Sequence, residues 1–154
     1  MPPKRSNANA SPIRWSPSLL ISERTLKHGR PISPKRMTRW SLMASVDDLW
    51  LVDFGEPHPG EPAAHRPALI LGPPDTFGPG FPFVIVVPLT RVRRGLSLHV
   101  EVEASADTGL DATSYIQCEL IRSINRNRLV HRLGGARPDV GHQVSTVVKT
   151  LLNH

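Results

Sequence analysis

The strongest constraint on folding is a short, uncharged and almost entirely apolar stretch at residues 81–89. Its centre, residues 83–87, reads Phe-Val-Ile-Val-Val, and such β-branched and aromatic residues favour an extended strand. The stretch is about half as long as a membrane-spanning helix needs to be. We therefore predict a strand that is covered on both faces, in a β-rich domain without a membrane span.

Other segments have strand patterns as well. Residues 98–103 alternate strictly between apolar and polar side chains, which predicts a half-buried strand with His99, Glu101 and Glu103 on one face. Residues 55–62 contain three prolines and two glycines and predict a loop. The remaining predicted strands are residues 49–54, 67–71 and 114–121, and Gly134-Gly135 indicates a turn.

The C-terminal segment has a helical period. Pro138 suits the first turn of a helix. Apolar side chains then recur on one face, at Val140, Val144, Val147, Val148, Leu151 and Leu152. Several short strands closed by one terminal helix predict a mostly β fold with a C-terminal helix, an α+β domain of the small β-barrel type.

The positive charges are concentrated at one end. The chain has 19 Lys and Arg against 13 Asp and Glu, but residues 1–42 hold nine of the bases and one of the acids. Residues 43–154 therefore carry a small net negative charge. We divide the chain into a basic, proline-containing tail at 1–42, expected to be disordered, and a folded domain at 43–154. The tail either attracts phosphate groups, has no role, or precedes the true start of the protein.

Several kinds of chemistry are excluded or unsupported. The single cysteine, Cys118, excludes an internal disulfide, and its apolar surroundings predict a buried core thiol. His58, Glu61 and His65 follow no recurrent metal-binding spacing, and the chain has no P-loop, dinucleotide fingerprint or nucleophile elbow. We expect no metal and no cofactor. No apolar stretch of signal-peptide length follows the first basic residues, so we expect a cytoplasmic protein.

An arginine and a threonine stand at the ends of predicted strands. Arg66 immediately precedes the strand at 67–71, and Thr90 follows the strand at 83–89. A guanidinium is a permanently charged, forked donor that suits phosphate oxygens, and a strand-end hydroxyl supplies a hydrogen bond at a fixed place. Together such groups stabilise the extra negative charge of a phosphoryl transition state without a metal. The alternative is a surface arginine and a strand-capping threonine.

A series of short blocks occurs in a fixed order along the chain: residues 48–54, 59–61, 65–70, 85–90, 98–102 and 114–124, followed by Arg128 and Leu129. Together these blocks resemble the MazF/PemK-type toxins of type II toxin–antitoxin systems. The likeness extends over about residues 47–152.

This resemblance implies an SH3-like, CcdB/PemK-like barrel, usually a homodimer, that cleaves single-stranded RNA without metal. The family reaction is attack of the ribose 2′-OH on phosphorus, which leaves 2′,3′-cyclic phosphate and 5′-OH ends. The resemblance makes Arg66 the main catalytic residue and Thr90 its partner on the phosphate. Because arginine stays protonated to about pH 12, charge stabilisation is the physically favoured role for Arg66.

The resemblance also implies a set of RNA-binding residues. Glu61 and His99 match positions that line the RNA groove, and Glu119 matches a glutamate near a base-binding pocket. Carboxylates accept hydrogen bonds from base amino groups, while loop capping and dimer contacts are the alternative roles. The basic loop with Arg91, Arg93 and Arg94 is predicted to follow the RNA backbone, or else is a solvated turn.

The chain departs from the family pattern at three positions. Asp47 replaces a usual Gly, Pro62 a common Gln, and Leu120 a Gln that helps to hold RNA in relatives. The change at Leu120 predicts an altered RNA affinity or sequence preference.

The resemblance further implies a cognate antitoxin protein as a partner. Two other functions stay open: a non-catalytic, CcdB-like toxin that poisons a topoisomerase, and an interaction barrel that has lost its chemistry. The combination of Arg66, Pro67 and Thr90 favours the nuclease over the topoisomerase poison, whereas Leu120 and the altered loop at Pro62 keep the inactive barrel open.

Overall fold

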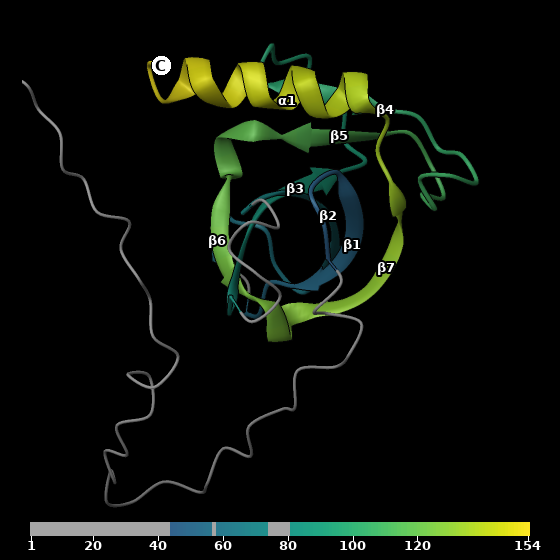
Figure 1. Ribbon diagram of the computed structural model, residues 1–154. Helices are drawn as coiled ribbons and strands as arrows, with labels where there is room; N and C mark the ends of the chain where they lie inside the picture. Colours follow the sequence, from purple (N-terminus) through teal and green to yellow (C-terminus); the bar gives the residue numbers. More distant parts are fainter. Residues whose placement is uncertain (1–43, 57, 74–80) are drawn as a thin grey trace, which may run out of the picture. The chain divides into compact units, whose positions relative to one another are not determined.

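The computed structural model describes residues 44–56, 58–73 and 81–154. The predictions made for residues 1–42 lie outside the described residues. The described part contains seven strands, two short 3₁₀ helices and one α-helix (Figure 1). In chain order these are β1 (Asp48–Asp53), β2 (His65–Gly72), β3 (Phe83–Thr90), β4 (His99–Val102), β5 (Ser114–Gln117), η4 (Cys118–Leu120), β6 (Arg122–Asn125), η5 (Arg126–Arg128), β7 (Leu129–Gly135) and α1 (Pro138–Leu151).

The strands form one curled, antiparallel sheet in the order β4-β5-β3-β2-β1-β7. Strand β3 is long enough to pair with two successive partners on one edge, because β6 pairs with its first half and β5 with its last two residues. The predicted class, mostly β with a C-terminal helix, is confirmed. Among the described strands, β4 and β7 end the path without pairing with each other, so the predicted barrel is open.

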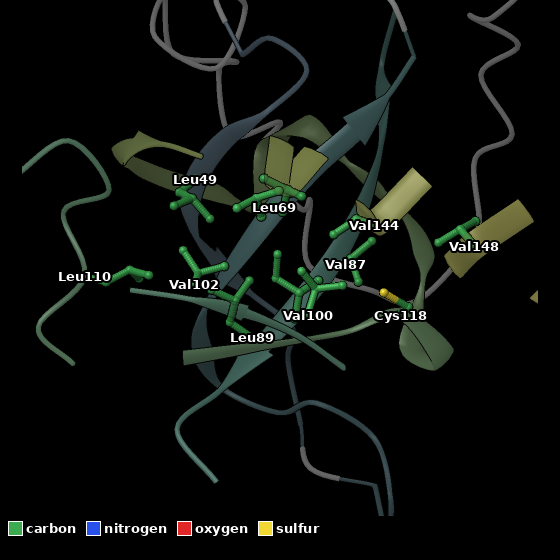
Figure 2. Packing of buried hydrophobic residues seen from close by; sticks show 12 residues of the cluster. Leu49, Leu69, Val87, Leu89, Val100, Val102, Leu110, Cys118, Val144 and Val148 are labelled. Carbon is green, nitrogen blue, oxygen red and sulfur yellow. The ribbon is translucent and has the colours of Figure 1, made fainter. Parts of the chain in front are cut away.

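One core lies between the sheet and α1. Alternate residues of the central strands, including Leu49, Leu69 and Val87, point to this side and are fully buried. The helix contributes Val140, Val144 and Val148, as its apolar stripe predicts (Figure 2). The stripe ends earlier than predicted, because Leu151 and Leu152 are exposed at the end of the helix.

A second core fills the opposite face of the same strands. It includes Trp50, Val52, Ala68 and Val86, which alternate with the residues of the first core. Because both faces of β1, β2 and β3 are covered, these strands are apolar at consecutive positions. The predicted strand at 83–89 is therefore confirmed, except that Phe83 and Ile85 are exposed where β3 runs beyond the helix-side core.

Local contacts corrected several other boundaries. The strand predicted at 114–121 ends at Gln117, where the chain turns into η4 and places Cys118 in the helix-side core, as predicted for its thiol. Strand β7 was not predicted, and Gly134-Gly135 lies inside it and is not a turn. Gly134 is required because a Cβ there would overlap the backbone carbonyl oxygen of Asp107. Because this contact joins segments that are distant in the chain, the residues next to Gly134 show no sequence pattern that predicts it.

The departure at Asp47 has a backbone explanation. Asp47 has a φ of 68°, in the left-handed region that glycine adopts without steric cost. Its N–H donates to the Ile70 carbonyl, and its own carbonyl accepts from the N–H of Ala136. The conformation is thus fixed by hydrogen bonds on both sides, and aspartate is among the few other residues that tolerate it.

Candidate functional site

The register of the sheet aligns the two candidate catalytic residues. Ala68 of β2 pairs with Pro88 of β3, and Arg66 and Thr90 lie two residues beyond them on their own strands, hence on the same face as that pair. Opposite residues in an antiparallel pair project from the same face. The half-buried Arg66 donates from Nε to the Ala63 carbonyl at 3.1 Å. The Thr90 hydroxyl oxygen accepts from the N–H of Val92 at 3.2 Å.

The same row continues across β5 and β4. Thr90 pairs with Tyr115, and Tyr115 pairs with Glu101. The next row on this face holds Gln117 and His99, which pair with each other. The structure thus gathers a charged and polar face on β2, β3, β5 and β4, on the side of the sheet away from α1. Sequence reasoning placed Glu101 on the face of His99 but missed Tyr115 and Gln117 as members of the site.

His99 and Glu119 form a contact that the sequence did not predict. His99 Nε2 lies 2.9 Å from Glu119 Oε1. The His99 side chain is 3% exposed and that of Glu119 is 28% exposed. The carboxylate can only accept, so the imidazole Nε2 is the donor. The His99 ring therefore lies beneath the surface in contact with Glu119, and the RNA-binding role of His99 stays a prediction.

Glu61 is held by a residue that sequence reasoning overlooked. Arg122 of β6 donates to Glu61 Oε2 at 2.8 Å, and its guanidinium carbon lies 5.8 Å from the centre of the Phe54 ring. This hydrogen bond and the positive charge of Arg122 lower the pKa of Glu61. Arg122 thereby ties the β1–β2 loop to β6. The sequence carried no signal of this pairing, because the two residues are 61 positions apart.

The basic loop after β3 lies at the margin of this face. Arg91 pairs with Asp111 at 3.2 Å, with both side chains largely exposed, and Arg93 and Arg94 are also exposed. A cavity of about 440 Å³ lies on the helix side of the sheet, where Thr90 and Arg91 line it together with His65 and His131. Arg66, Glu61, His99 and Glu119 do not line this cavity, and Thr90 is the residue that it shares with the polar face.

Neither a metal cluster nor a membrane-spanning helix occurs in the described part of the chain. No group of three or more His, Cys, Asp and Glu side chains is arranged there to hold a metal ion. None of its helices is long and apolar enough to cross a membrane.

Comparison with known proteins identifies similar sequences and folds. The model of the family described as PemK-like, MazF-like toxins of type II toxin–antitoxin systems matches residues 46–152. The crystal structure of MazF from Deinococcus radiodurans is 22% identical over 72% of this chain and 97% of that chain, with a TM-score of 0.63. An endoribonuclease from a Mycobacterial species, solved with its cognate antitoxin, is 22% identical over 71% and 95%, with a TM-score of 0.58. A MazE–MazF complex from Deinococcus radiodurans contains a chain that is 25% identical over 71% and 96%, with a TM-score of 0.55.

Proposed function

Because the chain belongs to the PemK-like, MazF-like toxins of type II toxin–antitoxin systems, we propose that it is a sequence-selective endoribonuclease that cleaves single-stranded RNA without a metal ion. The observation that carries this proposal is the alignment of Arg66 and Thr90 on one polar face of the sheet. Structural relatives described as endoribonucleases support the reaction class.

The reaction is an internal transfer of the phosphoryl group. The ribose 2′-oxygen forms a bond to the adjacent phosphorus, and the bond from phosphorus to the 5′-oxygen of the next nucleotide breaks. The 2′-hydroxyl loses a proton and the leaving 5′-oxygen gains one. The products are a 2′,3′-cyclic phosphate and a 5′-OH, and no water is consumed.

Arg66 supplies the positive charge that this reaction needs. Negative charge builds up on the non-bridging phosphate oxygens as the 2′-oxygen attacks, and a fixed cation stabilises that state most strongly. The Nε of Arg66 is engaged by Ala63, and its terminal amino groups have no hydrogen-bond partner among the described residues. They are therefore free to take phosphate oxygens as a fork. Thr90 adds a hydroxyl donor from the neighbouring strand.

The RNA follows the polar face of the sheet in this proposal. Glu119 contacts a base, and Arg93 and Arg94 contact the RNA backbone at the margin of the face. Glu61 and Arg91 contact the RNA only after they release their ion-pair partners in this structure, Arg122 and Asp111. A homodimer in the cytoplasm is the proposed working form, and a cognate antitoxin is the proposed inhibitor. Relatives solved as toxin–antitoxin complexes support the last point. Cleavage of cellular RNA would stop translation and growth.

The test is incubation of the full chain with a long single-stranded RNA in EDTA. Fragment ends are mapped for 5′-OH and cyclic phosphate. We expect discrete cuts with these ends, loss of cutting in Arg66→Ala, and normal cutting in Arg137→Ala, which removes an exposed arginine at the start of α1. Circular dichroism verifies that both variants fold.

Other outcomes would favour the two alternatives. A folded chain that leaves RNA intact but inhibits a topoisomerase would indicate a CcdB-like poison. A folded chain that does neither and binds a protein partner would indicate an inactive interaction barrel. Equal cutting by Arg66→Ala and the wild type would show that Arg66 is not catalytic.

A further inference from the structure

His99 and Glu119 differ sharply in their access to solvent, although their side chains touch. Only 3% of the His99 side chain is exposed, against 28% for Glu119. A ring buried to this degree cannot contact an RNA strand that lies on the surface. Any influence of His99 on RNA therefore passes through its neighbour.

The contact fixes one oxygen of the Glu119 carboxylate. Glu119 follows β5 in the short helix η4, which spans only Cys118–Leu120. The imidazole Nε2 donates to Oε1 at 2.9 Å, which selects the Nε2–H form of the neutral ring. His99 itself lies on β4, where its backbone pairs with that of Gln117, and its buried Nδ1 has no hydrogen-bond partner among the described residues. The second carboxylate oxygen, Oε2, has no hydrogen-bond partner among the described residues.

We propose that His99 is a positioning residue that orients Glu119, and that Glu119 Oε2 reads an amino-bearing RNA base. This inference rests on the proposed nuclease function. A carboxylate can only accept, so it selects a base edge that presents an exocyclic amino group, as cytosine, adenine and guanine do. It disfavours the two carbonyl oxygens of uracil. Because Leu120 is apolar, Glu119 is the polar side chain of η4, and base recognition at this helix therefore depends on Glu119.

Two substitutions of His99 separate positioning from mere packing. In His99→Gln, the side-chain amide nitrogen takes the place of Nε2 and can still donate to Glu119. In His99→Asn, the shorter amide takes the place of Nδ1 and leaves Glu119 without a donor. Both variants are polar and uncharged, so they form a matched pair. Glu119→Gln, which replaces an accepting oxygen by a donating group, completes the set.

The experiment measures cleavage of a pool of single-stranded RNAs with randomised positions around the cut. We expect the wild type and His99→Gln to share one sequence preference. His99→Asn and Glu119→Gln should lose discrimination at the same single nucleotide position, by about tenfold. Turnover of the best substrate at saturation should change much less than KM, because the lost contact is to a base and not to the reacting phosphate.

The outcomes distinguish the two proposals. If the wild type does not cut RNA, the proposed function is wrong and this inference falls with it. If the wild type cuts and His99→Asn keeps the full preference, or if His99→Gln loses it as completely as His99→Asn, the positioning role is wrong.

A measurement on the native chain covers the case in which His99→Asn does not fold. Nitrogen NMR shifts of the imidazole should show a protonated Nε2 and a bare Nδ1. The opposite tautomer would overturn the proposal, because a bare Nε2 cannot donate to the carboxylate.

Discussion

Replacing Asp47 by glycine should stabilise this protein. At a φ of 68°, an L-residue carries a steric cost of about 1–2 kcal/mol that glycine avoids. Glycine loses more backbone entropy on folding, which offsets about 0.5–1 kcal/mol of this gain. The net expectation is a gain of about 0.5–1 kcal/mol in the free energy of unfolding, or about 3 °C in Tm for a domain of this size.

The Asp47 carboxylate adds a pH-dependent part. Burial, and then the nearby charge of Asp48, raise the pKa of Asp47. A raised folded-state pKa means that the ionised form is less favourable in the folded chain than in the unfolded chain. The penalty is therefore absent below the unfolded pKa and fully present once the pH exceeds the folded pKa. The first turn of α1 has the opposite effect on the ionised carboxylate. Gly141 of this turn lies against the Asp47 carboxylate, and helix N-termini stabilise a negative charge by about 0.3–1 kcal/mol.

Urea unfolding of three chains at two pH values separates these effects. Asp47→Asn tolerates the same backbone conformation but has no charge, so it should exceed the wild type in stability near pH 7 and match it near pH 3. Asp47→Gly should exceed the wild type at both pH values. If Asp47→Gly were less stable than the wild type at both, contact of the side chain with α1 would outweigh the backbone strain, and the argument would be refuted.

Three further predictions concern other contacts. Gly134→Ala should destabilise the domain by about 2–3 kcal/mol in urea unfolding, because the Cβ added in strand β7 would overlap the Asp107 carbonyl oxygen. A loss of less than about 0.5 kcal/mol would contradict this packing. Arg122→Gln should raise the pKa of Glu61 in an NMR titration. In the wild type, the contribution of this pair to stability is lost only as the pH falls through the lowered pKa of Glu61, whereas in the variant it is absent at all pH values. An unchanged Glu61 titration would show that the contact does not persist in solution. Cys118 should react with a thiol reagent only upon unfolding, because its thiol is buried and burial raises its pKa to about 11. Rapid labelling of the native chain would contradict the place of Cys118 in the core.

Local patterns were sufficient where the chain's own neighbours decide the conformation. The strict alternation at 98–103 predicted β4, with His99 and Glu101 on one face. The stripe beginning at Val140 predicted α1. These elements have a repeating period because one face of each is buried, and that period is written directly in the sequence.

Patterns failed where a distant segment decides. Position 134 of strand β7 is a glycine because the backbone of Asp107, far away in the chain, approaches it too closely for a Cβ. Phe83 and Ile85 are exposed although their run is uniformly apolar, because no element of the described chain covers the first half of β3 on that face. Such contacts depend on how the sheet curls, which no single window of residues records.

The sequence by itself determined strands β1 to β5, the terminal helix and the identity of Arg66 and Thr90 as candidate residues, because these depend on local periods and on residues that match a known family. The tertiary structure alone decided which of the predicted residues lie side by side and which of them are exposed. It placed Arg66 and Thr90 on one face of neighbouring strands, tied Glu61 to Arg122, and buried His99 beneath Glu119. The reason is physical: pairing register and burial bring together side chains from strands far apart in the chain, and exposure is a property of the packed molecule and not of a residue type.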